Sequence, residues 1–417
     1  MDQTQNRPQV VIVGAGFGGM ETARALARAP VDVTIIDRHN HHTFQPLLYQ
    51  VATAALSSPD IAWPIRSILR NQENARVVMA EVTGIDVMKR IVHAGPIEIA
   101  YDFLVLATGA THSYFGHDEW ATEAPGLKSI DDALEIRRRI LLAFEHAEIA
   151  DKPAEQLRLL TFVIVGGGPT GVEMAGAIAE IARHALRSDF RRIDPAAARI
   201  VLVEAGPRIL PTFPERLSAY AQRSLERMGV EVKTNSLVTD CRKDGVVLKG
   251  GRIDAETIVW AAGVKASPAA QWIGAETDKA GRIKVGSHLE VPGHPEIFAV
   301  GDTAVLADPD APPIPGIAPA AKQMGKYVGR LIAVRVSDGE MPAPFTYRHF
   351  LDLATVGRKS AVVRRGRLQL TGYLGWWFWG IAHIYFLIGV RNRFVVALNW
   401  FWSYVTFQRG ARVITDR

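Results

Sequence analysis

Cysteine is almost absent from this chain: Cys241 is the only one among 417 residues. A single thiol cannot build an intrachain disulfide framework or a cysteine-rich zinc module. It also excludes every redox mechanism that needs two thiols from one chain.

A secretory leader is not visible at the N-terminus either. The first residues are polar, and the first apolar run begins only at Val10. We therefore expect the protein to stay in the compartment where it is made. Low-complexity segments are missing too. With 48% hydrophobic and 22% charged residues, the composition is typical of a globular protein of roughly two to four domains.

Acidic residues are scarce in the C-terminal part. Residues 341–417 contain eleven Lys or Arg and only two acids, Asp352 and Asp416, which gives this tail a charge of +9. The total of +5 leaves −4 for residues 1–340. The net charge therefore gives no reason to expect nucleic acid as a partner.

A dinucleotide-binding pattern opens the chain. Its parts are an apolar β-branched strand, a GxGxxG run, a helix and a strand that ends in an acid: residues 10–13, 14–19, 20–28 and 31–37. Gly14 makes the tight turn, Gly16 lets a pyrophosphate approach the backbone, and Gly19 lets helix and strand pack closely. The carboxylate of Asp37 can accept ribose hydroxyls. The order and spacing predict a βαβ nucleotide-binding unit.

The same pattern recurs in the middle of the chain. Its strand, glycine run, helix and final strand cover residues 161–165, 166–171, 172–183 and 200–204. The three glycines are Gly166, Gly168 and Gly171, and the acid is Glu204. An insert over 184–198 makes the spacing to this acid longer than usual. A carboxylate here favours NADH over NADPH, although Arg208 lies four residues further on.

Three further strands end in short signature turns, over residues 101–109, 255–263 and 296–302. They resemble the A-T-G and G-D signatures of the two-dinucleotide-binding flavoprotein superfamily. That resemblance implies FAD in the first unit, held in part by Thr108, Gly109, Gly301 and Asp302, with Asp302 on the ribityl chain. It implies NADH in the second unit, near Gly263.

The resemblance also implies the fold class and the domains. We expect an α/β protein with two Rossmann-like dinucleotide-binding domains and a C-terminal amphipathic helical region that anchors it to a membrane. The FAD domain is split over 1–112 and 285–335, the NADH domain covers 113–284, and the membrane-association region covers 336–417. His39, His41 and His42 lack a Cys or acid at ligand spacing, so we expect no metal there and place them beside the adenosine of FAD.

Aromatic residues concentrate in the tail. Thirteen of the 34 aromatics, including five of the nine tryptophans, lie between Tyr373 and Phe407, in two uncharged runs over 368–390 and 394–408. Flanking arginines favour anionic head groups, and Trp and Tyr favour the membrane interface. A buried helix pair or dimer interface and a membrane span remain alternatives. We favour two amphipathic helices that lie in one leaflet, with the lipid contact over 368–412.

These features together resemble the type II NADH:quinone oxidoreductases, the single-subunit, non-pumping NADH dehydrogenases. The resemblance covers essentially the whole chain. The matching segments are FQPLLYQVAT at 44–53, IAWPIR at 61–66, LVLATGA at 104–110, YFG at 114–116, GPTGVE at 168–173, and the tail with His383 and 391–393. By this resemblance Pro46 and Leu47 line the flavin, and Glu173 serves NADH placement or proton supply.

The family's quinone motif, A-Q-x-A-x-Q, reads APAAKQ at 318–323. Gln323 keeps the second glutamine, whereas Pro319 replaces the first and removes one side-chain contact to a quinone carbonyl. Pro319, Ala320 and Gln323 are therefore the expected quinone residues, with an altered pocket.

The resemblance implies transfer of hydride from NADH to non-covalent FAD and of two electrons to a membrane quinone, without proton pumping. We expect this on the cytoplasmic face of the inner (cell) membrane. A homodimer is left open. Two alternatives predict different behaviour: a soluble NADH-dependent reductase of a ferredoxin or rubredoxin type has no membrane affinity, and an NADH-sensing flavoprotein turns over very slowly with every quinone.

Overall fold

A computed structural model describes residues 7–308, 313–387, 389–406 and 410–414. The chain forms two compact units, each assembled from three segments. Unit 1 comprises Met1–Thr43, Ala62–Thr111 and Val264–His349, and unit 2 comprises Phe44–Ile61, His112–Gly263 and Phe350–Arg417.

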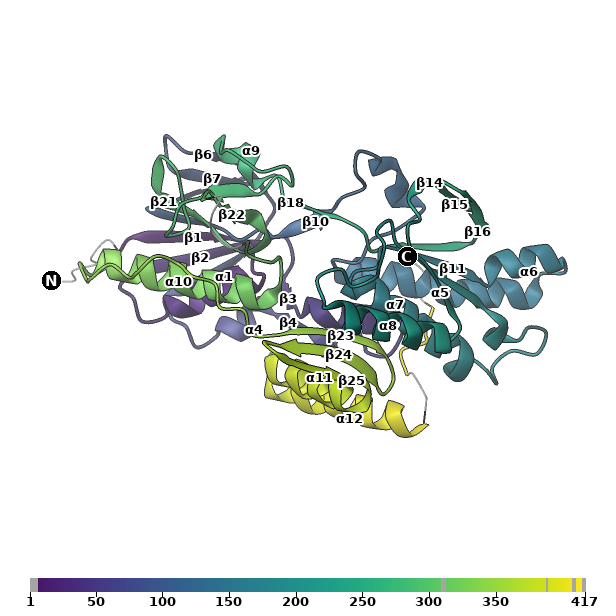
Figure 1. Cartoon of the computed structure of the whole chain (residues 1–417). Helices are drawn as coiled ribbons and strands as arrows, with labels where there is room; N and C mark the ends of the chain where they lie inside the picture. Colours follow the sequence, from purple (N-terminus) through teal and green to yellow (C-terminus); the bar gives the residue numbers. More distant parts are fainter. Residues whose placement is uncertain (1–6, 309–312, 388, 407–409, 415–417) are drawn as a thin grey trace. The chain divides into compact units, whose positions relative to one another are not determined.

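The core of unit 1 is a six-stranded sheet (Figure 1). In spatial order its strands are β20 (Glu290–Val291), β21 (His294–Ala299), β9 (Phe103–Leu106), β1 (Gln9–Val13), β2 (Asp32–Asp37) and β5 (Ala75–Met79). All neighbours are parallel except β20 and β21. The central strands are nearly continuous apolar runs because helices or loops cover a parallel sheet on both faces.

Two helices lie side by side on this sheet, α1 (Phe17–Ala25) and α10 (Ala318–Val336) (Figure 1). Glycines allow their close contact: a Cβ at Gly325 would lie 2.1 Å from the carbonyl oxygen of Gly18. Shorter elements complete the unit: β3 (His41–Thr43), β4 (Ala62–Pro64), α4 (Ile65–Leu69), β6 (Val82–Asp86), β7 (Ile91–Ala94), β8 (Ile97–Ala100), α9 (Ala269–Ile273), β19 (Ile283–Val285) and β22 (Ala304–Leu306). The strands that lead out of and back into unit 1 are β10 (Ala110–His112) and β18 (Val264–Ala266).

Unit 2 contains a four-stranded parallel sheet in the order β13 (Val230–Lys233), β12 (Arg199–Val203), β11 (Thr161–Val165) and β17 (Thr257–Trp260). Further elements are α5 (Ile130–Ile149), α6 (Pro153–Leu159), α7 (Pro169–Glu180), α8 (Glu215–Arg227) and the antiparallel strands β14 (Val238–Arg242), β15 (Gly245–Leu248) and β16 (Gly251–Asp254). Helix α5 starts with a capping box, in which Ser129 Oγ accepts from the Asp132 amide and the Asp132 carboxylate accepts from the Ser129 amide.

The C-terminal segment belongs to unit 2. An antiparallel sheet of β23 (Asp352–Gly357), β24 (Ser360–Arg365) and β25 (Leu368–Thr371) leads into α11 (Gly372–Phe386) and α12 (Val390–Thr406). The short helices α2 (Leu48–Ala52) and α3 (Ser58–Ile61) complete the unit. Among the described residues, no helix is both long and apolar enough to span a membrane.

The structure confirms the predicted α/β class with parallel sheets. Strand β11 has the predicted bounds, while α1 and α7 each begin three residues earlier than predicted. The sheet β23–β25 was not predicted, and the apolar run over 368–390 begins as its last strand before it becomes α11. The predicted FAD, NADH and membrane-association domains are assignments of function, which the packing into two units does not test.

Candidate functional site

The glycine loops of the two units have the same steric pattern. In the first, a Cβ at Gly14 would lie 2.4 Å from Ala107 O, and one at Gly19 would lie 1.9 Å from Gly14 O, so no side chain fits at either position. A Cβ at Gly16 meets no atom within 4 Å. The outer glycines are therefore required for packing, whereas the middle one leaves an open approach to the N-terminus of α1.

The second loop repeats this arrangement. Cβ atoms at Gly166 and Gly171 would lie 2.7 Å from Ala261 O and 1.8 Å from Gly166 O, and one at Gly168 meets nothing within 4 Å. The amide groups at the start of α7 can therefore face a ligand without a side chain between them. A helix N-terminus of this kind binds phosphate groups through its free N–H groups and its dipole.

In each unit, the acid at the end of the second strand of the βαβ pattern accepts hydrogen bonds from backbone amides of the glycine loop or next to it. Asp37 Oδ2 accepts from the Ala15 amide at 2.7 Å, and Asp37 Oδ1 accepts from the His39 amide at 2.8 Å. Glu204 Oε2 accepts from the Gly167 amide and Oε1 from the Gly206 amide, both at 2.6 Å. The insert before β12 therefore leaves Glu204 in the same relation to its loop as Asp37.

His42 is buried against the first loop. Its Nδ1 donates to Ala15 O at 2.7 Å, and its ring lies edge-on to Phe17 with centroids 5.0 Å apart. Burial lowers the pKa of His42 to about 4, so the imidazole is neutral at physiological pH. Within the described part of the chain, no three His, Cys, Asp or Glu side chains gather as metal ligands.

The ends of β9 and β21 bring the first unit's signature turns together. Thr108 Oγ1 lies 2.5 Å from Ser267 Oγ, and the Gly109 amide donates to Thr303 Oγ1 at 2.8 Å. Gly301 and Asp302 are in the short helix that contains Thr303, and a Cβ at Gly316 would lie 3.2 Å from Asp302 Oδ1. Sequence reasoning missed Ser267 and Thr303, although Thr303 directly follows the Gly-Asp signature.

Glu173 lies near the start of α7, beyond the second loop. Its Oε1 accepts from the Thr355 amide of β23 at 3.3 Å. Burial raises its pKa to about 8, against the smaller lowering effect of that hydrogen bond. About two helical turns further along α7, Glu180 Oε1 accepts from the Arg358 amide. Two carboxylates of α7 therefore bind backbone amides of the C-terminal sheet.

The predicted quinone residues lie at the start of α10 in unit 1. Ala320 is buried, and Pro319 is in the first turn. The Gln323 amide binds the Arg348 backbone in both directions, because Nε2 donates to Arg348 O at 2.9 Å and Oε1 accepts from Arg348 N at 3.1 Å. The side chain that the motif assigns to quinone therefore holds the segment that leads to the C-terminal region.

The segment with Pro46 and Leu47 lies in unit 2, where Leu47 is buried. It packs with the C-terminal helices through side-chain contacts that link two segments named in the sequence analysis, 44–53 and the aromatic tail. Trp400 Nε1 donates to Gln50 Oε1 at 2.7 Å, and the Trp400 and Trp379 rings stack at 5.1 Å. His383 Nδ1 in turn donates to Trp379 O at 2.8 Å. Burial lowers the pKa of His383 to about 4, so this ring is neutral.

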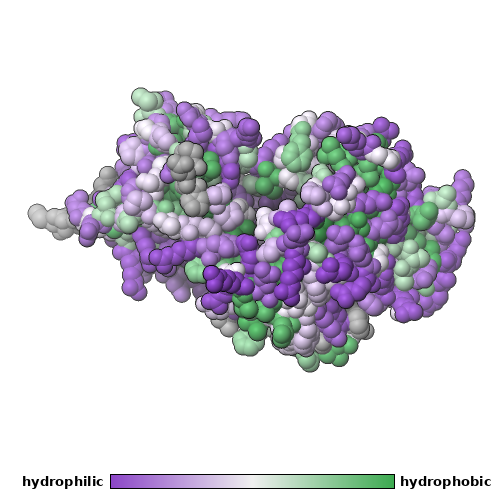
Figure 2. Space-filling model, in the orientation of Figure 1, coloured by the Kyte–Doolittle hydropathy of each residue, from purple (hydrophilic) through white to green (hydrophobic). Residues whose placement is uncertain are grey.

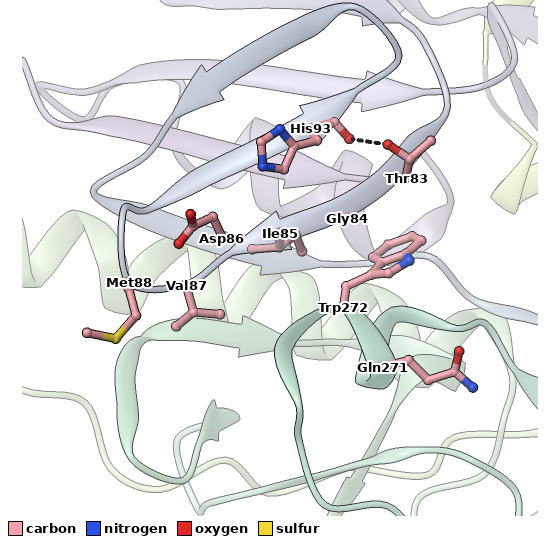
Figure 3. A pocket seen from close by; sticks show the side chains of 9 residues that line it. All are labelled: Thr83, Gly84, Ile85, Asp86, Val87, Met88, His93, Gln271 and Trp272. Carbon is pink, nitrogen blue, oxygen red and sulfur yellow. Dashed lines mark hydrogen bonds between the residues drawn. The ribbon is translucent and has the colours of Figure 1, made fainter.

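One pocket lies on unit 1 and has a volume of about 690 Å³ (Figure 3). Strands β6 and β7, the turn between them and α9 line it, with Thr83, Gly84, Ile85, Asp86, Val87, Met88, His93, Gln271 and Trp272. It contains none of the predicted site residues.

Cys241 is buried in unit 2, and burial raises the pKa of its thiol to about 12.

Comparisons with known proteins agree with this geometry. The family model of the pyridine nucleotide-disulphide oxidoreductases matches residues 8–325. The type II NADH:quinone oxidoreductase NdhA of Mycobacterium tuberculosis is 45% identical over 99% of this chain and 90% of its own length. A second one from that organism, Ndh, is 42% identical over 100% and 92%.

A solved structure of NDH2 from Plasmodium falciparum in complex with NADH has the same fold, with a TM-score of 0.87. It covers 99% of this chain and 100% of its own at 21% identity. With relatives this similar over nearly the full length, the chain belongs to the type II NADH:quinone oxidoreductases, flavoprotein enzymes that oxidise NADH with a quinone as electron acceptor.

Proposed function

We propose that the loop of unit 1 holds FAD and that the loop of unit 2 holds NADH. The doubled geometry of an open middle glycine, two packed outer glycines and a bracing acid carries this proposal. The FAD residues are Gly14, Gly16, Gly19, Asp37, Pro46, Leu47, Thr108, Gly109, Gly301 and Asp302. The NADH residues are Gly166, Gly168, Gly171, Glu204 and Gly263.

The reaction needs one proton more than NADH supplies. A hydride carries two electrons and one proton, and reduction of a quinone to a quinol takes two electrons and two protons. FAD, when bound, relays the two electrons between the substrates. With a pKa of about 8, Glu173 holds a proton at neutral pH and supplies the second one for the quinol.

The exposed face of the C-terminal helices supports membrane association. Among the side chains that the structure describes, six large apolar or aromatic ones of α11 and five of α12 are exposed: Tyr373, Leu374, Trp377, Ile381, Tyr385, Phe386, Phe394, Leu398, Phe401, Trp402 and Val405. Hydrophobic side chains gather along the lower edge in Figure 2, where Figure 1 has α11 and α12. We propose that this surface lies in one leaflet, on the cytoplasmic face of the inner membrane, and gives access to a lipid-dissolved quinone.

The proposal is tested by NADH oxidation with the purified, flavin-containing protein. We expect the absorbance of NADH to fall rapidly only when a soluble quinone analogue is added, with equimolar loss of NADH and quinone. Substitution of Gly168 by Val should abolish NADH oxidation and leave the flavin bound, whereas substitution of Gly16 by Val should release the flavin. The opposite pairing would overturn the assignment of the two units.

A further inference from the structure

Phe115 has a backbone conformation that its side chain disfavours. Its φ is +54°, in the left-handed region, and it is followed by Gly116 at +97°. The left-handed conformation is rare for a bulky residue and persists only where the surrounding structure imposes it. Such residues often belong to ligand sites, where the strain holds a side chain in position for binding.

The core does not provide that explanation. Tyr114, Trp120 and Trp260 form a buried aromatic cluster, each at most 5% exposed. Phe115, by contrast, is 69% exposed. Its ring lies edge-on to Trp260 at 6.3 Å. A Cβ at Gly263 would lie 2.6 Å from Phe115 Cζ, so the ring covers the backbone of Gly263. The ring is held in place but faces solvent.

The sheet order gives the direction of a dinucleotide across unit 2. Strand β12, with Glu204 at its end, lies on one side of β11, and β17 lies on the other. The loop after β11 lies directly against the end of β17, because a Cβ at Gly166 would be 2.7 Å from Ala261 O. Dinucleotides bind across this reversal of strand order, with the pyrophosphate at the loop and the adenosine ribose at the acid. The nicotinamide half therefore extends over the residues that follow β17, which include Gly263.

We propose that Phe115 is a positioning residue for the nicotinamide riboside half of NADH. Its ring forms an apolar wall beside Gly263 and limits the orientations of the nicotinamide. This inference rests on the proposed binding of NADH to the second loop, and it adds a residue that the nucleotide motifs do not contain.

The test compares two ligands of the flavin-containing enzyme, NAD+ and ADP-ribose, which lacks the nicotinamide. As competitive inhibitors against NADH, both should bind the unaltered enzyme. Substitution of Phe115 by Ala should raise the inhibition constant of NAD+ and the KM for NADH by about tenfold, the scale of one lost aromatic contact. The inhibition constant of ADP-ribose and the KM for quinone should stay unchanged.

Three further variants keep the outcome interpretable. Phe115→Gly removes the ring and relieves the left-handed strain, so it should show the same selective loss without a lower Tm. Phe115→Tyr should restore NAD+ affinity. Leu157→Ala removes another exposed side chain of unit 2, 61% exposed on α6, and should change neither constant.

Equal weakening of NAD+ and ADP-ribose, or no change for either, would overturn the role of Phe115. Failure of the proposed function has a different signature: neither ligand would compete with NADH in the unaltered enzyme.

Discussion

Glu173 shows how burial gives a carboxyl group a proton at neutral pH. Desolvation disfavours its ionised form more strongly than the Thr355 amide stabilises it, so its pKa rises to about 8. The sequence pointed to this residue only through the GPTGVE segment. Its Oε1 accepts from Thr355 of β23, a residue 182 positions further along the chain in a strand that was not predicted.

We expect Glu173→Gln to lower the rate of NADH:quinone turnover while the flavin stays bound. With a protonated carboxyl as the proton source, the turnover of the unaltered enzyme should fall as pH rises through about 8. In the variant, steady-state rates measured between about pH 6 and pH 9 should not show this fall, the alkaline limb of the pH profile. Glu180→Gln, on the same helix, is the control and should keep the limb. Superimposable pH profiles for Glu173→Gln and the unaltered enzyme would remove Glu173 from the proton route.

The same pKa predicts a pH dependence of stability. The folded protein holds this proton up to about pH 8, while the unfolded chain releases it near the ordinary value of 4.5. Native protein therefore binds more protons between these values, and its stability falls as pH rises across them and levels off above. Thermal unfolding at several pH values should show a flatter dependence in Glu173→Gln. An unchanged slope would indicate that the carboxyl is already ionised in the native state.

Cys241 should be chemically inert. It is 6% exposed, and burial raises its pKa to about 12, so the reactive thiolate is scarce. We expect Cys241→Ser to retain NADH:quinone turnover and the native enzyme to resist iodoacetamide, as measured by intact mass. Rapid alkylation with loss of turnover would show that the thiol serves the reaction.

The geometry of the two glycine loops was largely predictable, since their glycines and acids follow short-range rules. Glu204 illustrates why. Strand β12 pairs in parallel with β11, with Thr161 opposite Arg199, so both strands end at the same edge of the sheet. This pairing places Glu204 next to the loop after β11, whatever the length of the insert. Gln323 illustrates the limit. Its motif implies quinone, but its amide binds the backbone of Arg348, a contact 25 residues away that no local pattern contains.

At the scale of elements, helix α7 connects the second glycine loop with the C-terminal sheet. Its Gly176 lies against β23 so closely that a Cβ would be 1.9 Å from Val356 O. Together with the two carboxylates of α7, this contact fixes the helix to the sheet that carries α11. The sequence suggested the helix but not its partner, because the three strands of this sheet are only four to six residues long and give no clear pattern.

Gly176→Ala should therefore destabilise unit 2, although Ala ordinarily favours a helix interior over Gly by about 1 kcal/mol. The added methyl group must push β23 away, and overpacking of this kind costs about 1–3 kcal/mol. We expect a lower midpoint in urea unfolding followed by circular dichroism. Gly250→Ala, at a turn where a Cβ meets nothing within 4 Å, is the matched control. A midpoint equal to or above that of the unaltered protein would contradict the close contact.

For the whole molecule, charge and apolar exposure coincide in the C-terminal region. Its +9 charge belongs to the same stretch of sequence that exposes the aromatic side chains of α11 and α12, while residues 1–340 carry −4. Composition alone predicted this asymmetry. Which aromatics are exposed depended on packing, since Trp379 and Trp400 stack within the unit and Trp377 and Trp402 face outward.

We expect the full chain to co-sediment with vesicles, more strongly when they contain anionic lipid. Added salt should reduce this preference for anionic lipid, because it screens charges over about 8 Å at physiological ionic strength. Replacing Trp377 and Phe401 by Ser should weaken binding to neutral and anionic vesicles alike. Met88→Ser, at a residue of unit 1 that is 93% exposed, is the control. Retention of the double variant on neutral vesicles would assign the contact to another surface.

The close packing of α7 against β23 also limits which segments of this chain can be replaced by those of another protein. A chimera that joins a foreign C-terminal region to this nucleotide-binding unit would place an unmatched strand against Gly176, Glu173 and Glu180. We expect such a chimera to fold only when α7 and the sheet that it contacts come from the same protein. The C-terminal sheet and the helices that follow it are therefore coupled to α7 by packing, and exchange of this region alone should give an unstable protein.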